Sequence, residues 1–163
     1  MRFGRCGYNC QVPVIDTAAY TAGDNVGGRL LIDGFGPHGT GVLKHVTVTD
    51  FDNQRAALTI LFFESLPAAT FTNNAAFPAL TAADLARVIG KVEVAAADYT
   101  TFNGRAVATV PTSIVLWGVQ PTPAPDGGTG SDKRSLYYAV QTSGTPTYTT
   151  VGSLGVQLGV LLD

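Results

Sequence analysis

Apolar and polar residues alternate along several short stretches of the chain. Across residues 42–49, Val46 and Val48 fall on one face and the neighbouring threonines on the other. A period of two residues places successive side chains on opposite faces of a β-strand, so this stretch predicts a strand with one buried face. The alternation returns at residues 154–162, where leucines and valines are separated mainly by glycine and glutamine. The glycines of this last strand predict close neighbours.

Further strands are predicted where β-branched and aromatic residues cluster between turn residues. They lie at residues 29–33, 58–63, 91–94, 99–102, 105–110, 113–119 and 136–142, with at most a short strand at 11–15. The stretch 58–63 is apolar on both faces, which predicts a strand that is either central or covered on its outer side by a partner. We expect it to be the most buried strand of the fold.

Two turns predict hairpins. Asn103-Gly104 is the pair of residues that most favours a two-residue β-hairpin, here between 99–102 and 105–110. The glycine-dense loop at 34–41 predicts a second hairpin, between strands 29–33 and 42–49.

One short helix is predicted near residues 82–89. Thr81 is a favourable N-cap, and Asp84 stands three residues later in the capping-box position. Leu85, Val88 and Ile89 share a helical face, and Gly90 is placed to end the helix.

These elements predict an all-β fold, an antiparallel β-sandwich or jelly roll of about eight strands with one short helix. The length of 163 residues fits a single domain. Residues 1–25 show no sustained period and are expected to form an extended N-terminal arm outside the core, leaving the β-sandwich domain at 26–163. Residues 120–134 are rich in proline and glycine and predict a long loop.

Charge is scarce in this chain. Only 13% of residues are charged, the net charge is −2, and the ten lysines and arginines are scattered. Nucleic-acid binding is therefore not expected, because no basic stripe could neutralise phosphates. No apolar run is long enough to cross a membrane or to serve as a secretion signal, so we expect the chain to stay in the cytoplasm of the producing cell. A weakly charged surface also favours cover by another protein.

The residues needed for catalysis or metal binding are few and poorly spaced. His38 and His45 are the only histidines, and no serine lies in a Gly-x-Ser-x-Gly motif, so hydrolase chemistry is not expected. Cys6, Cys10 and the two histidines miss the spacing of zinc fingers. The Asp50–Asn53 segment resembles the start of a calcium loop but lacks its glycine and glutamate, which favours an ordinary turn. We expect no enzyme activity, no cofactor and no metal.

Three aromatic residues leave a second function open. Trp117, Tyr137 and Tyr138 could form a platform for a sugar, as in a carbohydrate-binding module or a fibre-like adhesin of a virion. Aromatic residues on alternating strands are more often core or cross-strand pairs.

Several segments together resemble small virion structural proteins of tailed bacteriophages, of the kind that decorate or cement the capsid. They are Tyr-Thr-Ala-Gly-Asp-Asn-Val-Gly-Gly at 20–28, Gly-Val-Leu at 41–43 leading into Val-Thr-Val-Thr-Asp at 46–50, Ala-Ala-Leu-Thr at 56–59, Phe-Thr-Asn-Asn-Ala-Ala-Phe at 71–77 before Ala-Asp-Leu at 83–85, and Leu-Gly-Val-Leu-Leu-Asp at 158–163. The resemblance implies a protein on the outer surface of the virion capsid that binds the major capsid protein and stabilises the shell. The apolar N-terminal segment, the apolar strand at 58–63 and the low charge predict a homo-oligomer, for which the resemblance favours a trimer. The resemblance carries over no catalytic residue.

The N-terminal arm is the segment we expect to bind the partner. It is too apolar for a solvated tail, so its apolar side chains predict contacts with a neighbouring subunit or the capsid protein. These side chains are Phe3, Tyr8, Val12, Val14, Ile15 and Tyr20.

Overall fold

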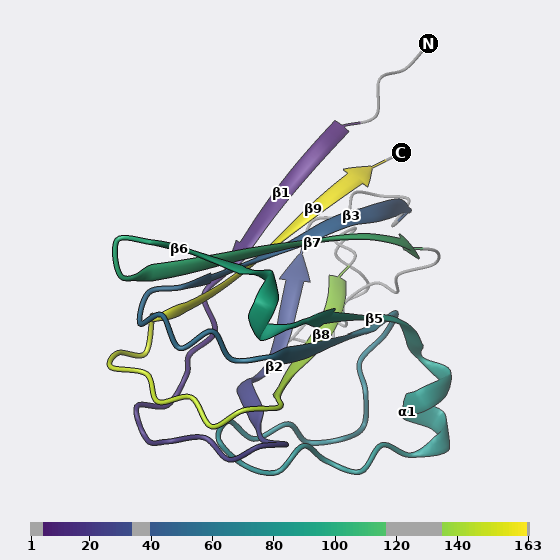
Figure 1. Ribbon diagram of the computed structural model, residues 1–163. Coiled ribbons are helices and arrows are strands. Elements are labelled where there is room, and N and C mark those ends of the chain that lie inside the picture. Colours follow the sequence, from purple (N-terminus) through teal and green to yellow (C-terminus); the bar gives the residue numbers. More distant parts are fainter. Residues whose placement is uncertain (1–4, 34–39, 117–134, 163) are drawn as a thin grey trace.

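The computed structural model describes residues 5–33, 40–116 and 135–162 of the chain. Within these ranges it contains nine strands and two short helices, arranged as two facing sheets (Figure 1). The elements are β1 (Arg5–Gln11), β2 (Asn25–Asp33), β3 (Gly41–Asp50), β4 (Leu58–Phe63), α1 (Ala82–Ala86), β5 (Val88–Val94), the 3-10 helix η1 (Ala96–Asp98), β6 (Tyr99–Phe102), β7 (Arg105–Leu116), β8 (Ser135–Thr142) and β9 (Leu154–Leu162).

The strand order gives the topology of the fold. One sheet has the order β1-β9-β3-β7-β6 and the other the order β2-β8-β4-β5, with every neighbouring pair antiparallel. The pairs β1 with β9, β2 with β8, β3 with β7 and β4 with β5 are nested along the chain. This nesting, a long antiparallel hairpin rolled over itself, is the jelly-roll arrangement. The all-β prediction is confirmed, and β6 is an additional edge strand.

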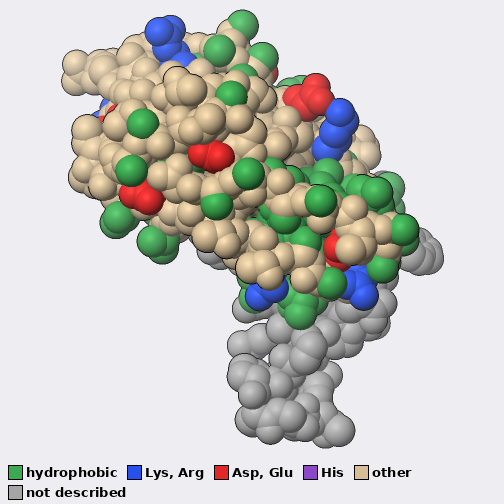
Figure 2. Space-filling model, turned by 90° about the horizontal axis from the view of Figure 1, so that it is seen from below, with side chains coloured by type: hydrophobic (Ala, Val, Ile, Leu, Met, Phe, Trp, Pro, Cys, Tyr) green, Lys and Arg blue, Asp and Glu red, His purple; other side chains and the backbone are tan. Residues whose placement is uncertain are grey.

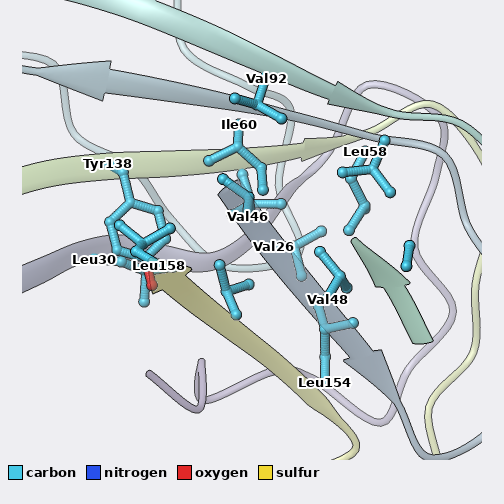
Figure 3. Close-up of a cluster of buried hydrophobic side chains, with 14 of the residues drawn as sticks. Val26, Leu30, Val46, Val48, Leu58, Ile60, Val92, Tyr138, Leu154 and Leu158 are labelled. Carbon is cyan, nitrogen blue, oxygen red and sulfur yellow. The ribbon is translucent and has the colours of Figure 1, made fainter. Parts of the chain in front are cut away.

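The main core fills the space between the two sheets (Figure 3). Val46 and Val48 of β3 are fully buried, as their alternation predicts, and they face Leu58 and Ile60 of β4 across the sandwich. Because residues two apart along a strand share a face, alternating sequences from both sheets supply this layer.

A second, smaller core lies on the outer face of the four-stranded sheet. Phe63 of β4 packs there against Phe71, with ring centroids 5.9 Å apart, and Phe71 packs edge-on against Phe77 at 5.3 Å. Both partners belong to the segment between β4 and α1, so the chain covers this face itself. Of the two alternatives predicted for this strand, central or covered by a partner, the first is confirmed, because β4 lies between β8 and β5. Its two apolar faces require no partner protein.

The helix is present but shorter than predicted. Thr81 caps α1 with the capping box completed by Asp84, as expected. The helix ends at Ala86, however, and residues 88–90 belong to β5. Leu85 is exposed. Gly90 does not end a helix, because it belongs to β5 and pairs with Phe62 of β4. A Cβ added to Gly90 would lie 2.7 Å from the Ile114 side chain of β7. Close contact between the two sheets, rather than capping, explains this glycine.

One predicted hairpin is confirmed and one is wrong. Asn103 and Gly104 both have positive φ, 48° and 79°, and join β6 to β7 as a two-residue turn. The predicted hairpin between residues 29–33 and 42–49 does not form, because β2 pairs with β8 while β3 pairs with β7 and β9 in the other sheet. The predicted strand at 113–119 continues β7 through Pro111 as far as Leu116.

The expectation that residues 1–25 form an arm outside the core is wrong for much of that segment. Residues 5–11 form β1, which pairs in full with β9. Ile15 and Tyr20 are 1% and 2% exposed and belong to the main core. Periodicity within residues 1–25 gives no sign of this, because the partner strand lies about 150 residues further along the chain.

Candidate functional site

Exposed apolar side chains gather at one end of the sandwich. Of the nine large hydrophobic residues that are exposed in the described part of the chain, five come from segments that meet at the end where β3 and β6 finish and β7 and β9 begin. We call these five the apolar rim: Val12, Val14, Phe51, Phe102 and Val151. Exposed apolar side chains at one end of a fold make that end a candidate for interaction with other molecules.

Val12 and Val14, which belong to the segment expected to form the N-terminal arm, lie in the first part of this rim. Val12 and Val14 are 57% and 72% exposed, while Pro13 and Ile15 between and after them are buried. The Ile15 amide donates a hydrogen bond to the carbonyl of Val151 at 3.4 Å. An extended backbone with one face in the core therefore turns both valines outward beside Val151.

The two phenylalanines complete the rim on the other side. The Phe51 amide donates to the Ser153 carbonyl at 2.8 Å, which places this turn next to the Val151 segment. The Arg105 guanidinium lies 5.1 Å from the centroid of the Phe51 ring, and Arg105 pairs with Phe102 across the hairpin. The rim thus presents one cation held against an aromatic ring, a contact that is attractive at exposed sites.

Hydrogen bonds to the carboxylates of Asp50 and Asp52 connect the segments that carry the rim. Asp50 accepts hydrogen bonds from the Asp52 and Arg55 amides at 3.0 and 2.7 Å, which is the turn predicted for this segment. Asp52 accepts hydrogen bonds from the Thr149 amide at 2.7 Å and from its hydroxyl at 2.8 Å. These bonds join the turn after β3 to the loop before β9.

The two carboxylates have opposite pKa shifts. Burial raises the pKa of Asp50 above its usual 3.8, because its backbone donors only partly offset the loss of water. Burial acts in the same direction on Asp52, but hydrogen bonds from Ser153 and Thr149 outweigh it and hold the pKa of Asp52 below 3.8.

We expect acid to weaken the link made by Asp52. A lowered pKa in the folded state contributes stability above pH 3.8, and that contribution is lost as the pH falls through the folded pKa. Asp52→Asn should cost about 1 kcal/mol at neutral pH, because a charged acceptor is lost at a half-exposed site. The difference in free energy of unfolding between Asp52→Asn and the wild type should become smaller when chemical denaturation is measured below pH 3.8.

Asp50→Asn provides the matched control with the opposite slope. Its raised pKa contributes stability below pH 3.8 that is lost as the pH rises through the folded value. Equal pH slopes for the two variants in chemical denaturation would contradict the assignment.

Buried polar contacts fix residues 13–20 to the rest of the fold. The Tyr20 hydroxyl donates to Asn73 Oδ1 at 2.8 Å and accepts from the Asp16 amide at 2.8 Å. Asn73 Oδ1 also accepts from the Gly27 amide at 2.7 Å. Gly27 has φ +80°, and a Cβ there would lie 2.4 Å from Pro13 Cβ. The segment that carries Val12 and Val14 is therefore held on both sides.

The residues considered for metal or acid–base chemistry do not form a site in the described chain. His45 lies on β3 opposite Gly159, where an added Cβ would come within 2.0 Å of the imidazole. This close approach is the kind predicted for the glycines of the last strand. His38 lies outside the described residues. Across residues 5–33, 40–116 and 135–162, no three His, Cys, Asp or Glu residues gather as metal ligands.

The prediction of an aromatic platform for a sugar is wrong for Tyr137 and Tyr138. Tyr137 and Tyr138 are both buried, Tyr137 in the second core and Tyr138 in the main core, 6.0 Å from the Phe62 ring. Neither can stack on a sugar from solution. Trp117 lies outside the described residues.

The six predicted partner-binding residues divide into three groups. Val12 and Val14 are in the rim, whereas Ile15 and Tyr20 are buried and cannot contact a partner. Phe3 lies outside the described residues, and Tyr8 is placed by its backbone alone, opposite Gly159. Three rim residues, Phe51, Phe102 and Val151, were not predicted from the sequence. The available signal was a large apolar residue beside a turn in an otherwise polar segment.

Comparisons with known proteins add little. No protein-family model and no curated protein matches the chain. A solved structure described as "Structure of Triatoma Virus (TrV)" aligns with 99% of this chain and 64% of that chain, at 11% identity and a TM-score of 0.26. A likeness this distant supports no inference about function. In the described part of the chain, no helix is long and apolar enough to span a membrane.

Proposed function

We propose that this chain is a structural virion protein that decorates or cements a capsid by docking its apolar rim on the outer surface of the shell. The observation that carries the proposal is the gathering of five exposed apolar side chains at one end of a rigid jelly roll. Its role would be binding rather than catalysis.

The rigidity of the rim supports this function. Each rim segment is hydrogen bonded to a neighbouring segment or to the core, so docking would order few additional residues. Binding by a pre-organised surface loses less conformational entropy than binding by a flexible tail. A cement protein acts in many copies, and avidity then adds to the affinity of each contact.

The surface composition supports a neutral partner. Figure 2 shows the molecule from below, where the few acidic and basic side chains lie singly or beside an opposite charge on a mostly uncharged surface. Jelly rolls occur in viral capsid proteins as well as in lectins, so the fold agrees with a virion role. The resemblance to phage decoration proteins is what selects the major capsid protein as the partner.

Co-sedimentation with shells assembled from the major capsid protein tests the proposal. Val14→Glu places a charge on the most exposed rim residue and should weaken binding at least about tenfold, because a charge would be buried without a partner. Leu85→Glu is the matched control, since Leu85 is 57% exposed but lies on α1, outside the rim.

Comparison of the two variants shows whether the chain binds the shell through the rim. Loss of binding by Val14→Glu with retention by Leu85→Glu supports docking through the rim. Full binding by Val14→Glu, or an equal loss in both variants, would contradict it.

A further inference from the structure

Strand β1 is the outermost strand of the five-stranded sheet. Within the described residues it pairs with β9 and with no strand on its other side, and Figure 1 shows it at the border of the five-stranded sheet. An edge strand directs unpaired amide and carbonyl groups outward, which makes it a template for another strand unless the edge is blocked.

The other three edges carry such blocks. β6 has only four residues, and the part of β7 that extends beyond it contains Pro111, which has no amide hydrogen. β5 carries the exposed Lys91–Glu93 pair. β2 is interrupted by a bulge between Val26 and Arg29. β1 has seven residues in unbroken register and no proline, and its one charged residue, Arg5, stands at the end of the strand.

We infer that two copies of this chain associate through β1, edge to edge and antiparallel about a two-fold axis. An antiparallel pair of identical strands is self-complementary, so a two-fold axis satisfies both edges at once. The blocks on β2, β5 and β6 disfavour pairing of β1 with a different edge, which would give open chains. This two-fold dimer takes the place of the trimer that the resemblance favours, and it does not depend on the proposed capsid binding.

The register of the pair follows from the bounds of the strand. Full overlap of residues 5–11 with their copies places Tyr8 opposite itself on the axis. Arg5 then faces Gln11, so no two like charges are opposed. Cys6 falls opposite Cys10 of the second copy, and opposed residues in an antiparallel pair have Cα atoms about 4.5–5.5 Å apart, within reach of a disulfide.

Sedimentation velocity on the full chain tests the association. The wild-type chain should have twice the 16.9 kDa mass of one copy. Tyr8→Lys alone and Tyr8→Glu alone should each sediment as a monomer, because like charges meet on the axis. An equimolar mixture of the two variants should recover the dimer, which also shows that both variants fold.

Oxidative cross-linking tests the register independently of these variants. With copper-phenanthroline as the oxidant, the wild-type chain should form a covalent dimer, and Cys6→Ser or Cys10→Ser alone should form at least about tenfold less. A mixture of the two serine variants should again cross-link. A wild-type monomer, a trimer, or a dimer that persists in both charged variants would overturn the inference, as would equal cross-linking by each single serine variant.

Discussion

Replacing Phe62 with alanine is expected to lower the free energy of unfolding by about 3–5 kcal/mol. Phe62 is fully buried on β4, the strand that lies between β8 and β5, and its ring packs 6.0 Å from that of Tyr138. Neighbours from two strands and the opposite sheet cannot collapse into the space left by a missing ring, so the cost includes a cavity as well as lost burial.

Phe102→Ala is the matched control for this prediction. It removes the same atoms from a strand residue that is 61% exposed, so the change should stay below about 0.5 kcal/mol. Urea denaturation of the three proteins measures both effects. A loss below 1 kcal/mol in Phe62→Ala would mean that β4 is not central to the sandwich.

Gly27→Ala is expected to cost about 2–4 kcal/mol, from two effects at one position. An L-residue at φ +80° is strained by about 1–2 kcal/mol, and the added Cβ would meet Pro13 Cβ at 2.4 Å. Because Pro13 precedes the buried Ile15, relief of this clash would displace the segment that carries Val12 and Val14.

Gly23→Ala separates the two effects. Gly23 has φ +97°, but an added Cβ there would have nothing within 4 Å. It should cost only the strain, about 1–2 kcal/mol, and leave hydrogen exchange at the Ile15 amide unchanged. Gly27→Ala should speed that exchange. Equal stability losses and equal exchange in the two variants would show that the Pro13 segment does not pack on Gly27.

Local sequence signals predicted the parts of the fold that depend on local geometry. The apolar character of both faces of 58–63 predicted a strand that is either central or covered by a partner, and β4 is central. Asn103-Gly104 predicted the β6–β7 hairpin. The capping box at Thr81 located the start of α1, but its end was missed because Gly90 packs against β7 instead of ending a helix.

Pairings between distant segments could not be predicted in this way. The nesting of β1 with β9 and of β2 with β8 joins residues more than 100 positions apart, so no local period reveals it. The same limit applies to the candidate site. The apolar rim exists only because four separate segments converge at one end of the sandwich, and only Val12 and Val14 among its members lay in a segment chosen for its apolar character.

Quantitative mass spectrometry of purified virus particles, from cultures that produce this chain, determines whether the chain is a component of the virion. We expect the chain to copurify with intact particles through repeated density gradients, in many copies and at a fixed ratio to the major capsid protein. Recovery of the chain only in the soluble fraction, with none on particles, would contradict this expectation.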